Sequence, residues 1–147
     1  MKREYPERPV VGVGAVIVDG ARGSGRKVLL IRRGSEPLRG QWSLPGGGLE
    51  TGERLEDGLR REVREETGLE INVLGLAGVY DRIMPDASGK AQFHYVLIDY
   101  VCSVAGGELR PGGDAAEARW CEESELDSME ITALTLPVIK EVLAKAE

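Results

Sequence analysis

Two glutamates in a predicted amphipathic helix are the residues of this sequence whose placement best suits chemistry. Apolar side chains recur at every fourth position from Leu55 over the segment 55–67, and at about 100° per residue they form one stripe of a helix. By the same period Glu62 and Glu66 fall within about 20° of that stripe, and Glu65 lies at its edge. Two carboxylates pointing towards an apolar core repel each other and lose hydration unless a cation lies between them. Carboxylate oxygens suit Mg²⁺ or Mn²⁺, so the helix predicts a divalent metal site.

A glycine-rich stretch directly before this helix adds to the prediction. The run Pro45-Gly46-Gly47-Gly48 leaves backbone carbonyls and amides uncovered near the start of the helix. Amides at such a place suit a phosphate, and a carbonyl oxygen suits the coordination shell of a metal. Together the two features predict a phosphate chain that is bound through a metal bridge.

Length, charge and cysteine content limit the class of protein. The chain has 147 residues and a net charge of −6, from 19 basic and 25 acidic side chains. This length suits one domain with its own core, and no apolar run approaches the ~20 residues of a membrane span. The negative charge argues against a nucleic acid polymer as partner. Cys102 and Cys121 do not form a metal-type pair, and the polar residues 1–9 lack the apolar centre of a signal peptide, which together predict a cytoplasmic protein with reduced thiols.

The elements that must position the glutamates form an alternation of strands with two distant helices. We expect one domain over residues 1–147, in which residues 1–8 are a loose tail. Strands are predicted over residues 10–18, 27–33, 42–44, 71–83, 93–104 and 118–121, and helices over 55–67 and 134–144. Gly68 is predicted to end the first helix, and residues 106–118 are predicted to be a loop. This order indicates an α/β protein with a mixed sheet covered by helices.

The fixed residues between Gly47 and Leu69 resemble the signature of the Nudix hydrolases. Gly47 is followed after five residues by Glu53, and after seven more by the run Arg61-Glu62-Val63-Arg64-Glu65-Glu66-Thr67-Gly68-Leu69. Residues 40–47 resemble the usual lead-in of the same family. The resemblance implies an α/β/α sandwich with a mixed β-sheet between helices. It also implies an enzyme that hydrolyses a nucleoside diphosphate linked to another group, by attack of water on one phosphorus of the pyrophosphate.

The resemblance assigns roles to the residues of the signature. Glu62, Glu65 and Glu66 would be ligands of Mg²⁺ or Mn²⁺, and the backbone carbonyl of Gly46 or Gly47 would complete the inner shell. Glu62 or Glu66 would also orient or deprotonate the attacking water, directly or through a metal-bound water.

Two further roles concern residues around the metal ligands. Arg61 and Glu53 would form a salt bridge that holds the loop against the helix. Family members often supply a general base from a later loop, where this sequence has Asp114 and Glu117. Glu117 occupies the more usual place before a tryptophan, and simple solvation of a charged loop is the alternative for both residues.

The substrate is less constrained than the reaction. Pro85 lies sixteen residues after Leu69, where ADP-ribose-cleaving members of the family typically carry a proline. We therefore expect ADP-ribose to be cleaved to AMP and ribose 5-phosphate. The alternatives are a nucleoside triphosphate or oxidised nucleotide, a nucleotide sugar, and a dinucleoside polyphosphate. A non-catalytic nucleotide-sensing domain on the same fold is a further alternative, but loss of the helix glutamates would favour it and they are all present.

A small set of side chains outside the signature is predicted to contact the substrate. These candidates are Arg32, Trp42, Arg82, Pro85 and Asp114. Residues 32 and 33 are both arginines and alternate along one strand, so only one of them can face the site. Core packing is the competing interpretation for Trp42. Because many relatives form dimers, a homodimer is also expected.

Overall fold

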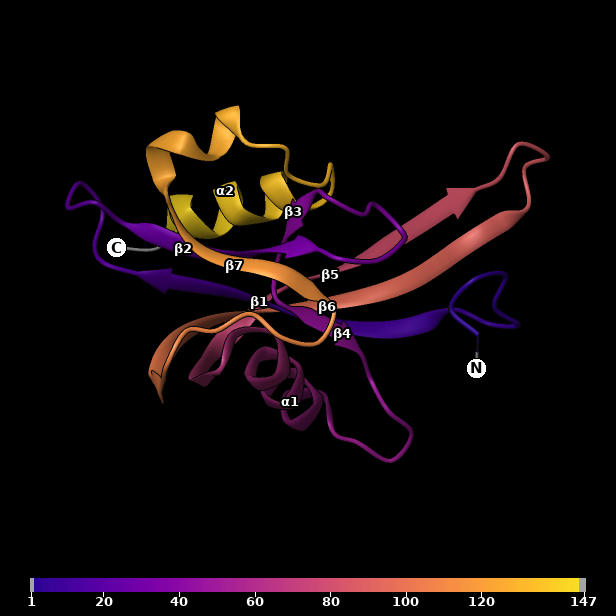
Figure 1. Cartoon of the computed structure of the whole chain (residues 1–147), viewed down its shortest axis with the longest axis horizontal. Coiled ribbons are helices and arrows are strands. Elements are labelled where there is room, and N and C mark those ends of the chain that lie inside the picture. The colour runs from indigo at the N-terminus through magenta and orange to yellow at the C-terminus, as the bar shows by residue number, and fades with distance from the viewer. Residues whose placement is uncertain (1, 146–147) are drawn as a thin grey trace.

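A mixed sheet with one helix on each face organises the protein, as Figure 1 shows for the computed structural model, which describes residues 2–145. The elements in chain order are β1 (Val10–Asp19), β2 (Lys27–Arg33), β3 (Trp42–Ser43), β4 (Gly46–Gly48), α1 (Leu55–Thr67), β5 (Leu69–Pro85), β6 (Ala91–Gly107), β7 (Ala115–Glu122), the 3₁₀ helix η1 (Glu123–Ser128) and α2 (Thr135–Lys145). Helix α1 lies on one side of the sheet and α2 on the other. The predicted α/β/α sandwich is confirmed.

Strand β1 is the centre of the sheet and the point where its two parts meet. The strand order is β3-β2-β1-β6-β5, and β4 and β7 pair with β1 and β2 respectively. Strands β1 and β6 run parallel, whereas the other pairs are antiparallel, so the sheet is mixed as predicted. Residues 12–14 of β1 pair with β4 on one side and with β6 on the other. The glycine-rich stretch is therefore fixed to the central strand and is not a free loop.

Helix α1 occupies the range that its apolar period predicted. Leu59 and Val63 are fully buried against the sheet. The helix ends at Gly68, which takes a left-handed conformation with φ 76° and donates its N–H to the carbonyl of Arg64. The helix therefore places Glu62 and Glu66 against strand β4.

Two apolar cores stabilise the sandwich, one on each face of the sheet. The α1-side core includes alternate residues of β1 and β6 such as Ala15, Ile17 and Cys102. The α2-side core includes the intervening residue Val16, with Ile139 and Leu143 of α2. Since successive strand residues point to opposite faces, burial on both faces makes β1 a nearly continuous apolar run.

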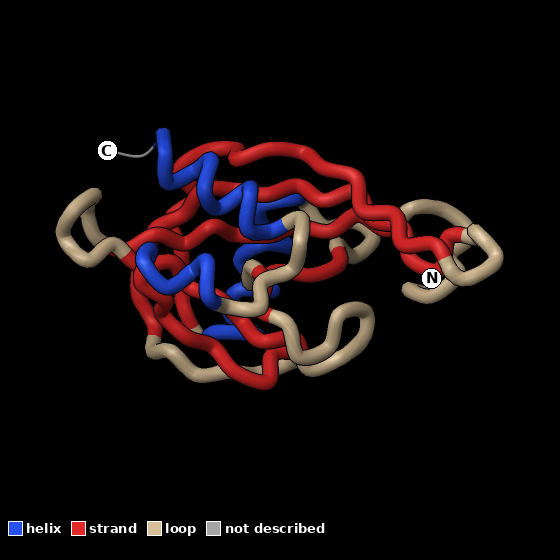
Figure 2. Tube along the Cα trace, turned by 90° about the horizontal axis from the view of Figure 1, so that it is seen from above, coloured by secondary structure: helices blue, strands red, loops and turns tan. Residues whose placement is uncertain are grey.

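The largest differences from the predicted elements concern the strands after α1. Strands β5 and β6 are each 17 residues long, and together they form a hairpin that projects beyond the rest of the sheet (Figure 2). Gly75 and Gly78 lie at shifts of register, so they bend β5 without ending it. Strand β7 begins at Ala115, inside the predicted loop 106–118, and η1 was not predicted. The ends of these strands depend on hydrogen bonding to neighbouring strands, which the local pattern of residue types does not predict.

The N-terminal segment, predicted to be a loose tail, lies along the projecting hairpin. The Tyr5 N–H donates to the carbonyl of Gln92, and its hydroxyl donates to Asp86, both at 2.7 Å. Arg3 reaches Asp114 at 3.5 Å.

Both cysteines of the chain are free and buried. Within residues 2–145, no helix is long and apolar enough to cross a membrane.

Candidate active site

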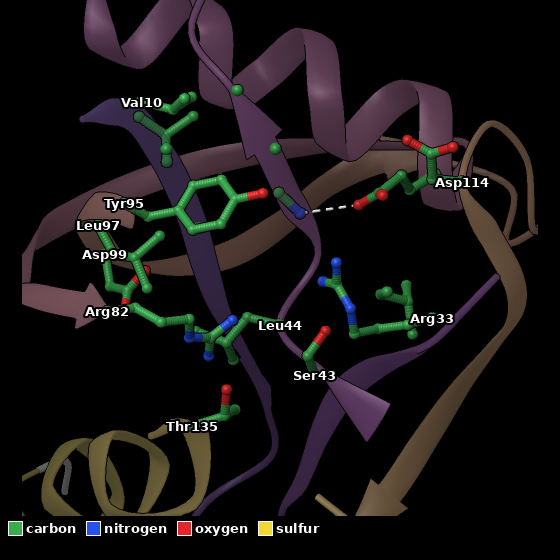
Figure 3. Close-up of a pocket in the computed structure, with 18 of the residues that line it drawn as sticks. Val10, Arg33, Ser43, Leu44, Arg82, Tyr95, Leu97, Asp99, Asp114 and Thr135 are labelled. Carbon is green, nitrogen blue, oxygen red and sulfur yellow. Dashed lines mark hydrogen bonds between the residues drawn. The ribbon is translucent and has the colours of Figure 1, made fainter. Parts of the chain in front are cut away.

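A cavity of about 120 Å³ opens beside the C-terminal half of α1, between β1, β4, β6 and the start of α2. Glu66 and the three glycines of β4 line one end of it. Arg33 and Arg82 extend into it from opposite sides, and Tyr95 lies between them and Val10 (Figure 3). The cavity therefore joins Glu66 of the helix to the cations Arg3, Arg33 and Arg82 and to apolar walls.

Glu66 is the most deeply buried carboxylate of the site. It is 4% exposed, and its Oε1 accepts a hydrogen bond of 2.8 Å from the backbone N–H of Gly46. Burial raises the pKa of Glu66 to about 8, and the charges of Glu62 and Asp114 act in the same direction. Within residues 2–145 no ion pair neutralises this carboxylate. A bound cation would therefore offset the free-energy cost of burying its negative charge.

Glu62 lies one turn earlier on the helix and packs directly on glycine backbone. A Cβ atom at Gly47 would lie 2.5 Å from its Oε2, a distance that a real side chain cannot occupy. Burial raises the pKa of Glu62, and the neighbouring Arg61 opposes this effect. Gly47 is therefore required for the carboxylate to approach the β4 backbone.

Arg61 forms the predicted salt bridge with Glu53 and so connects helix α1 to the segment before it. Its Nε and Nη2 donate to the two oxygens of Glu53 at 2.6 and 2.9 Å, which is bidentate geometry. Its Nη2 also donates to the carbonyl of Gly48 at 3.2 Å, and its Nη1 donates to Glu62 at 2.9 Å. Arg61 lowers the pKa of Glu53 to about 2. Arg61 therefore fixes the relative positions of β4, the loop and the carboxylate at position 62.

The residues present fit a hard divalent cation. Glu62 and Glu66 offer carboxylate oxygens, and β4 offers backbone carbonyls close by. Glu65 is half-exposed and lies 3.5 Å from Arg61. Among the described residues, no three acidic, histidine or cysteine side chains converge on one point. The fit rests on the oxygen-only donor set and on the burial of Glu66 without a counter-cation.

The structure selects Arg33 over the predicted Arg32 as the cationic residue of β2. Arg33 lines the cavity and donates from Nε to the carbonyl of Pro37 at 2.6 Å. Arg32 is not a lining residue and pairs with Glu117 at 2.8 Å. Arg32 and Glu117 thus pair with each other outside the cavity, and their predicted roles stay predictions.

The remaining predicted contacts divide between the cavity and other parts of the fold. Arg82 and Asp114 line the cavity, in agreement with the prediction. Trp42 packs against the α2-side core and lies under the guanidinium of Arg119, 5.8 Å from the ring centre. Pro85 is exposed at the end of β5. Neither Trp42 nor Pro85 lines the cavity. The core packing that competed with substrate contact for Trp42 is present, and the role of Pro85 stays a prediction.

Several residues of the cavity were not selected from the sequence. Ser43, Asp99 and Thr135 are buried polar residues that line it. A signal for this set exists in β1, where Gly12 and Gly14 alternate with buried apolar residues and leave one face of the strand bare. Another signal is Asp99 itself, a single acidic residue in the apolar run that became β6.

Comparison with known proteins places the chain in a family. Residues 8–142 match the NUDIX domain. The chain therefore belongs to the Nudix family, and its helix glutamates and β4 glycines carry the signature of that family.

Individual relatives support the same assignment. The ADP-ribose pyrophosphatase of Methanocaldococcus jannaschii is 41% identical over 115 residues, which are 78% of this chain and 66% of that protein. This chain thus spans about two thirds of that relative. The MutT Nudix hydrolase of Burkholderia pseudomallei is 30% identical with a TM-score of 0.77, over 92% of this chain and 99% of its own. The Nudix domain of Shewanella oneidensis NrtR, solved with ADP ribose, shares the fold at a TM-score of 0.76 and 21% identity, over 95% and 89%.

Proposed function

We propose that this chain is a divalent-metal-dependent hydrolase of the pyrophosphate bond in nucleoside diphosphate derivatives. The buried Glu66 and the partly buried Glu62 beside the β4 backbone are the observation that carries the proposal. Anionic side chains alone would repel a pyrophosphate, so the site requires cations between protein and substrate. Arg33 and Arg82, which enter the cavity from opposite sides, add positive charge for the same ligand.

The residues divide into metal ligands and groups that position them. Glu62, Glu65 and Glu66 would hold Mg²⁺ or Mn²⁺, together with a carbonyl oxygen of Gly46 or Gly47. When bound, such an ion neutralises charge on phosphoryl oxygens and makes water a better nucleophile.

Other side chains act around these ligands. Arg61, clamped on Glu53, keeps Glu62 in place against β4. Asp114 lines the cavity near Glu66 and is the acidic residue of the later loop that is placed to orient water. Arg33 and Arg82 are placed to bind anionic oxygens of the substrate.

We further propose ADP-ribose as substrate, with AMP and ribose 5-phosphate as products. The support is the 41% identity to a relative named ADP-ribose pyrophosphatase. A nucleoside triphosphate or an oxidised nucleotide is the second candidate, because a relative named nucleoside triphosphatase NudI is 32% identical over 101 residues. The cytoplasmic location and the homodimer stay predictions.

A substrate panel with product analysis tests both levels of this proposal. Purified protein with Mg²⁺ or Mn²⁺ is given ADP-ribose, nucleoside triphosphates, 8-oxo-dGTP, a nucleotide sugar and a dinucleoside polyphosphate, and kcat/KM is measured for each. We expect ADP-ribose to give the highest value, with AMP released and excess chelator abolishing turnover. A clear preference for a triphosphate would overturn the substrate assignment. Binding of nucleotides with no turnover of any of them would refute the enzyme and favour a sensing domain.

A further inference from the structure

We infer that Asp99 is a specificity-determining residue whose carboxylate accepts hydrogen bonds from donor groups on a ring of the nucleotide substrate. The donors are either the hydroxyls of a ribose or the amino group of a base. The inference rests on the proposed function and extends it, because it assigns the recognition of the substrate beyond the pyrophosphate to a residue outside the Nudix signature.

The first observation is that Asp99 is buried without a partner for its side chain. It is 7% exposed and lines the cavity. Among residues 2–145 its carboxylate makes no hydrogen bond and no ion pair, and Arg82 is the one cation that acts on it electrostatically. Buried polar groups in folded proteins nearly always have hydrogen-bond partners. The acceptor capacity of Asp99 is therefore left for a molecule that enters the cavity.

The second observation is that the neighbouring strand is built to leave this carboxylate uncovered. The parallel register of β1 and β6 pairs Gly14 with Asp99 and Gly12 with Leu97. A Cβ atom at Gly14 would lie 2.5 Å from Oδ1 of Asp99, and one at Gly12 would lie 3.0 Å from Leu97. Any side chain at position 14 would displace the carboxylate. The two glycines thus give the cavity its depth and admit a ligand to its floor.

The third observation is the distribution of charge along the cavity. Glu66 and the β4 glycines lie at one end, where a metal would hold the pyrophosphate. A carboxylate accepts hydrogen bonds and donates none, so Asp99 repels phosphate and selects a neutral donor. Arg82 extends across the cavity towards Leu44 from the side where Asp99 lies (Figure 3). The carboxylate of Asp99 itself is therefore suited to a donor group of a sugar or a base.

The apolar and aromatic walls of the cavity suit a ring of the substrate. Val10, Leu44, Tyr95 and Leu97 supply apolar and aromatic surface around the polar floor. The cavity measures about 120 Å³. The hydroxyl of Ser43, which also lines the cavity, is buried without a hydrogen-bond partner among the described residues. Asp99 and Ser43 are thus two polar side chains at the cavity that lack hydrogen-bond partners among the described residues.

The test compares substrates that differ by one donor in the wild type and in variants at position 99. The panel is ADP-ribose, its inosine analogue, which lacks the amino group, and its 2′-deoxy and 2″-deoxy analogues, each lacking one ribose hydroxyl. For D99A we expect kcat/KM on ADP-ribose to fall by about 10- to 150-fold, the worth of a hydrogen bond to a charged group. On the analogue that lacks the recognised donor, kcat/KM should change by less than about 3-fold.

The identity of the insensitive analogue distinguishes the two sources of donor. If the base is recognised, D99N should turn over the inosine analogue better than the wild type does, because the amide offers a donor to the keto oxygen. If a ribose is recognised, one deoxy analogue should be insensitive to D99A while the inosine analogue still loses turnover. Either result supports the inference.

A matched control and a separate readout keep the test decisive. Asp81 is an exposed aspartate of β5 that pairs with Val96. It directly precedes the cavity-lining Arg82, so its side chain points to the opposite face of the strand. D81N and D81A should therefore leave kcat/KM unchanged. Thermal denaturation identifies any variant that fails to fold, and D99N conserves the shape of the side chain. An equal loss on all four substrates, or no loss on any, would overturn the role of Asp99. Failure of the wild type to hydrolyse ADP-ribose would instead refute the proposed function.

Discussion

Replacement of Glu66 by glutamine should stabilise the metal-free protein at alkaline pH while removing its activity. The wild-type side chain is 4% exposed, and burial raises its pKa to about 8 from 4.5. A glutamine is nearly isosteric, and its carbonyl oxygen can still accept the hydrogen bond from the N–H of Gly46. The substitution therefore removes the charge and leaves the packing and the backbone contact in place.

The magnitude follows from the proton affinity of Glu66 in the folded and unfolded chains. Below about pH 4.5 the carboxyl is protonated in both, so it does not affect stability. As the pH rises from about 4.5 to about 8, the unfolded chain ionises first, and the free energy of unfolding falls. At 1.36 kcal/mol for each tenfold change in affinity, the full cost is about 5 kcal/mol above pH 8. In E66Q the side chain does not ionise, so this loss of unfolding free energy does not occur.

Urea denaturation in the presence of chelator at pH 5, 7 and 9 measures the effect. We expect the difference in unfolding free energy between E66Q and wild type to grow by about 4 kcal/mol from pH 5 to pH 9. Asp99 and Glu62, whose pKa values are also raised by burial, are present in both proteins, so their contributions largely cancel in the difference. A difference that does not change with pH would refute the assignment of a buried, charge-destabilised carboxyl to Glu66.

Divalent metal provides the second half of this prediction. Because a cation binds the ionised carboxylate, Mg²⁺ or Mn²⁺ should stabilise the wild type at pH 9 and stabilise E66Q much less. Turnover by E66Q should fall by about 10²- to 10⁴-fold. Equal stabilisation of both proteins by metal would show that Glu66 is not a ligand.

Further predictions test the other parts of the site. In G47A the new Cβ would lie 2.5 Å from the Glu62 carboxylate, so kcat/KM should fall by about 100-fold, whereas G75A, with open space around it, should retain activity; normal turnover by G47A would contradict the role of this glycine. R33A should lower kcat/KM by about 10- to 150-fold, and R32A, which breaks an exposed ion pair with Glu117 and an exposed hydrogen bond to the carbonyl of Gly40, should change it by less than 2-fold; the reverse order would show that Arg32 and not Arg33 contacts the substrate. R61K loses the bidentate clamp and should weaken metal affinity or activity by about 10- to 100-fold, as a Mg²⁺ titration of turnover would show.

Helix α1 shows how far local sequence determined the outcome. The four-residue recurrence of apolar side chains and the glycine at position 68 predicted its bounds, because both depend only on helical period and backbone conformation. The same period predicted that Glu66 is buried, which the structure confirms. The contact between Arg61 and Glu53 followed from the family signature and is also present.

The choice between Arg32 and Arg33 required the tertiary structure. Strand alternation predicts that the two side chains point to opposite faces, but it does not say which face forms the cavity. The pairing of β2 with β7 decides this, and it places Glu117 beside Arg32. The same limit applies to Trp42, because the sequence around an aromatic residue on a strand does not show whether its ring contacts a substrate or packs in a core.

The sequence by itself determined the local arrangement of the proposed metal site, because the glutamates of α1 and the backbone that they approach lie within residues 46–66. Only the tertiary structure decided what surrounds the remainder of the substrate. Gly14 and Asp99 are far apart in the chain, and the parallel pairing of β1 with β6 brings them together. Such pairing depends on loop closure and on burial of both faces of the sheet, which no local period encodes.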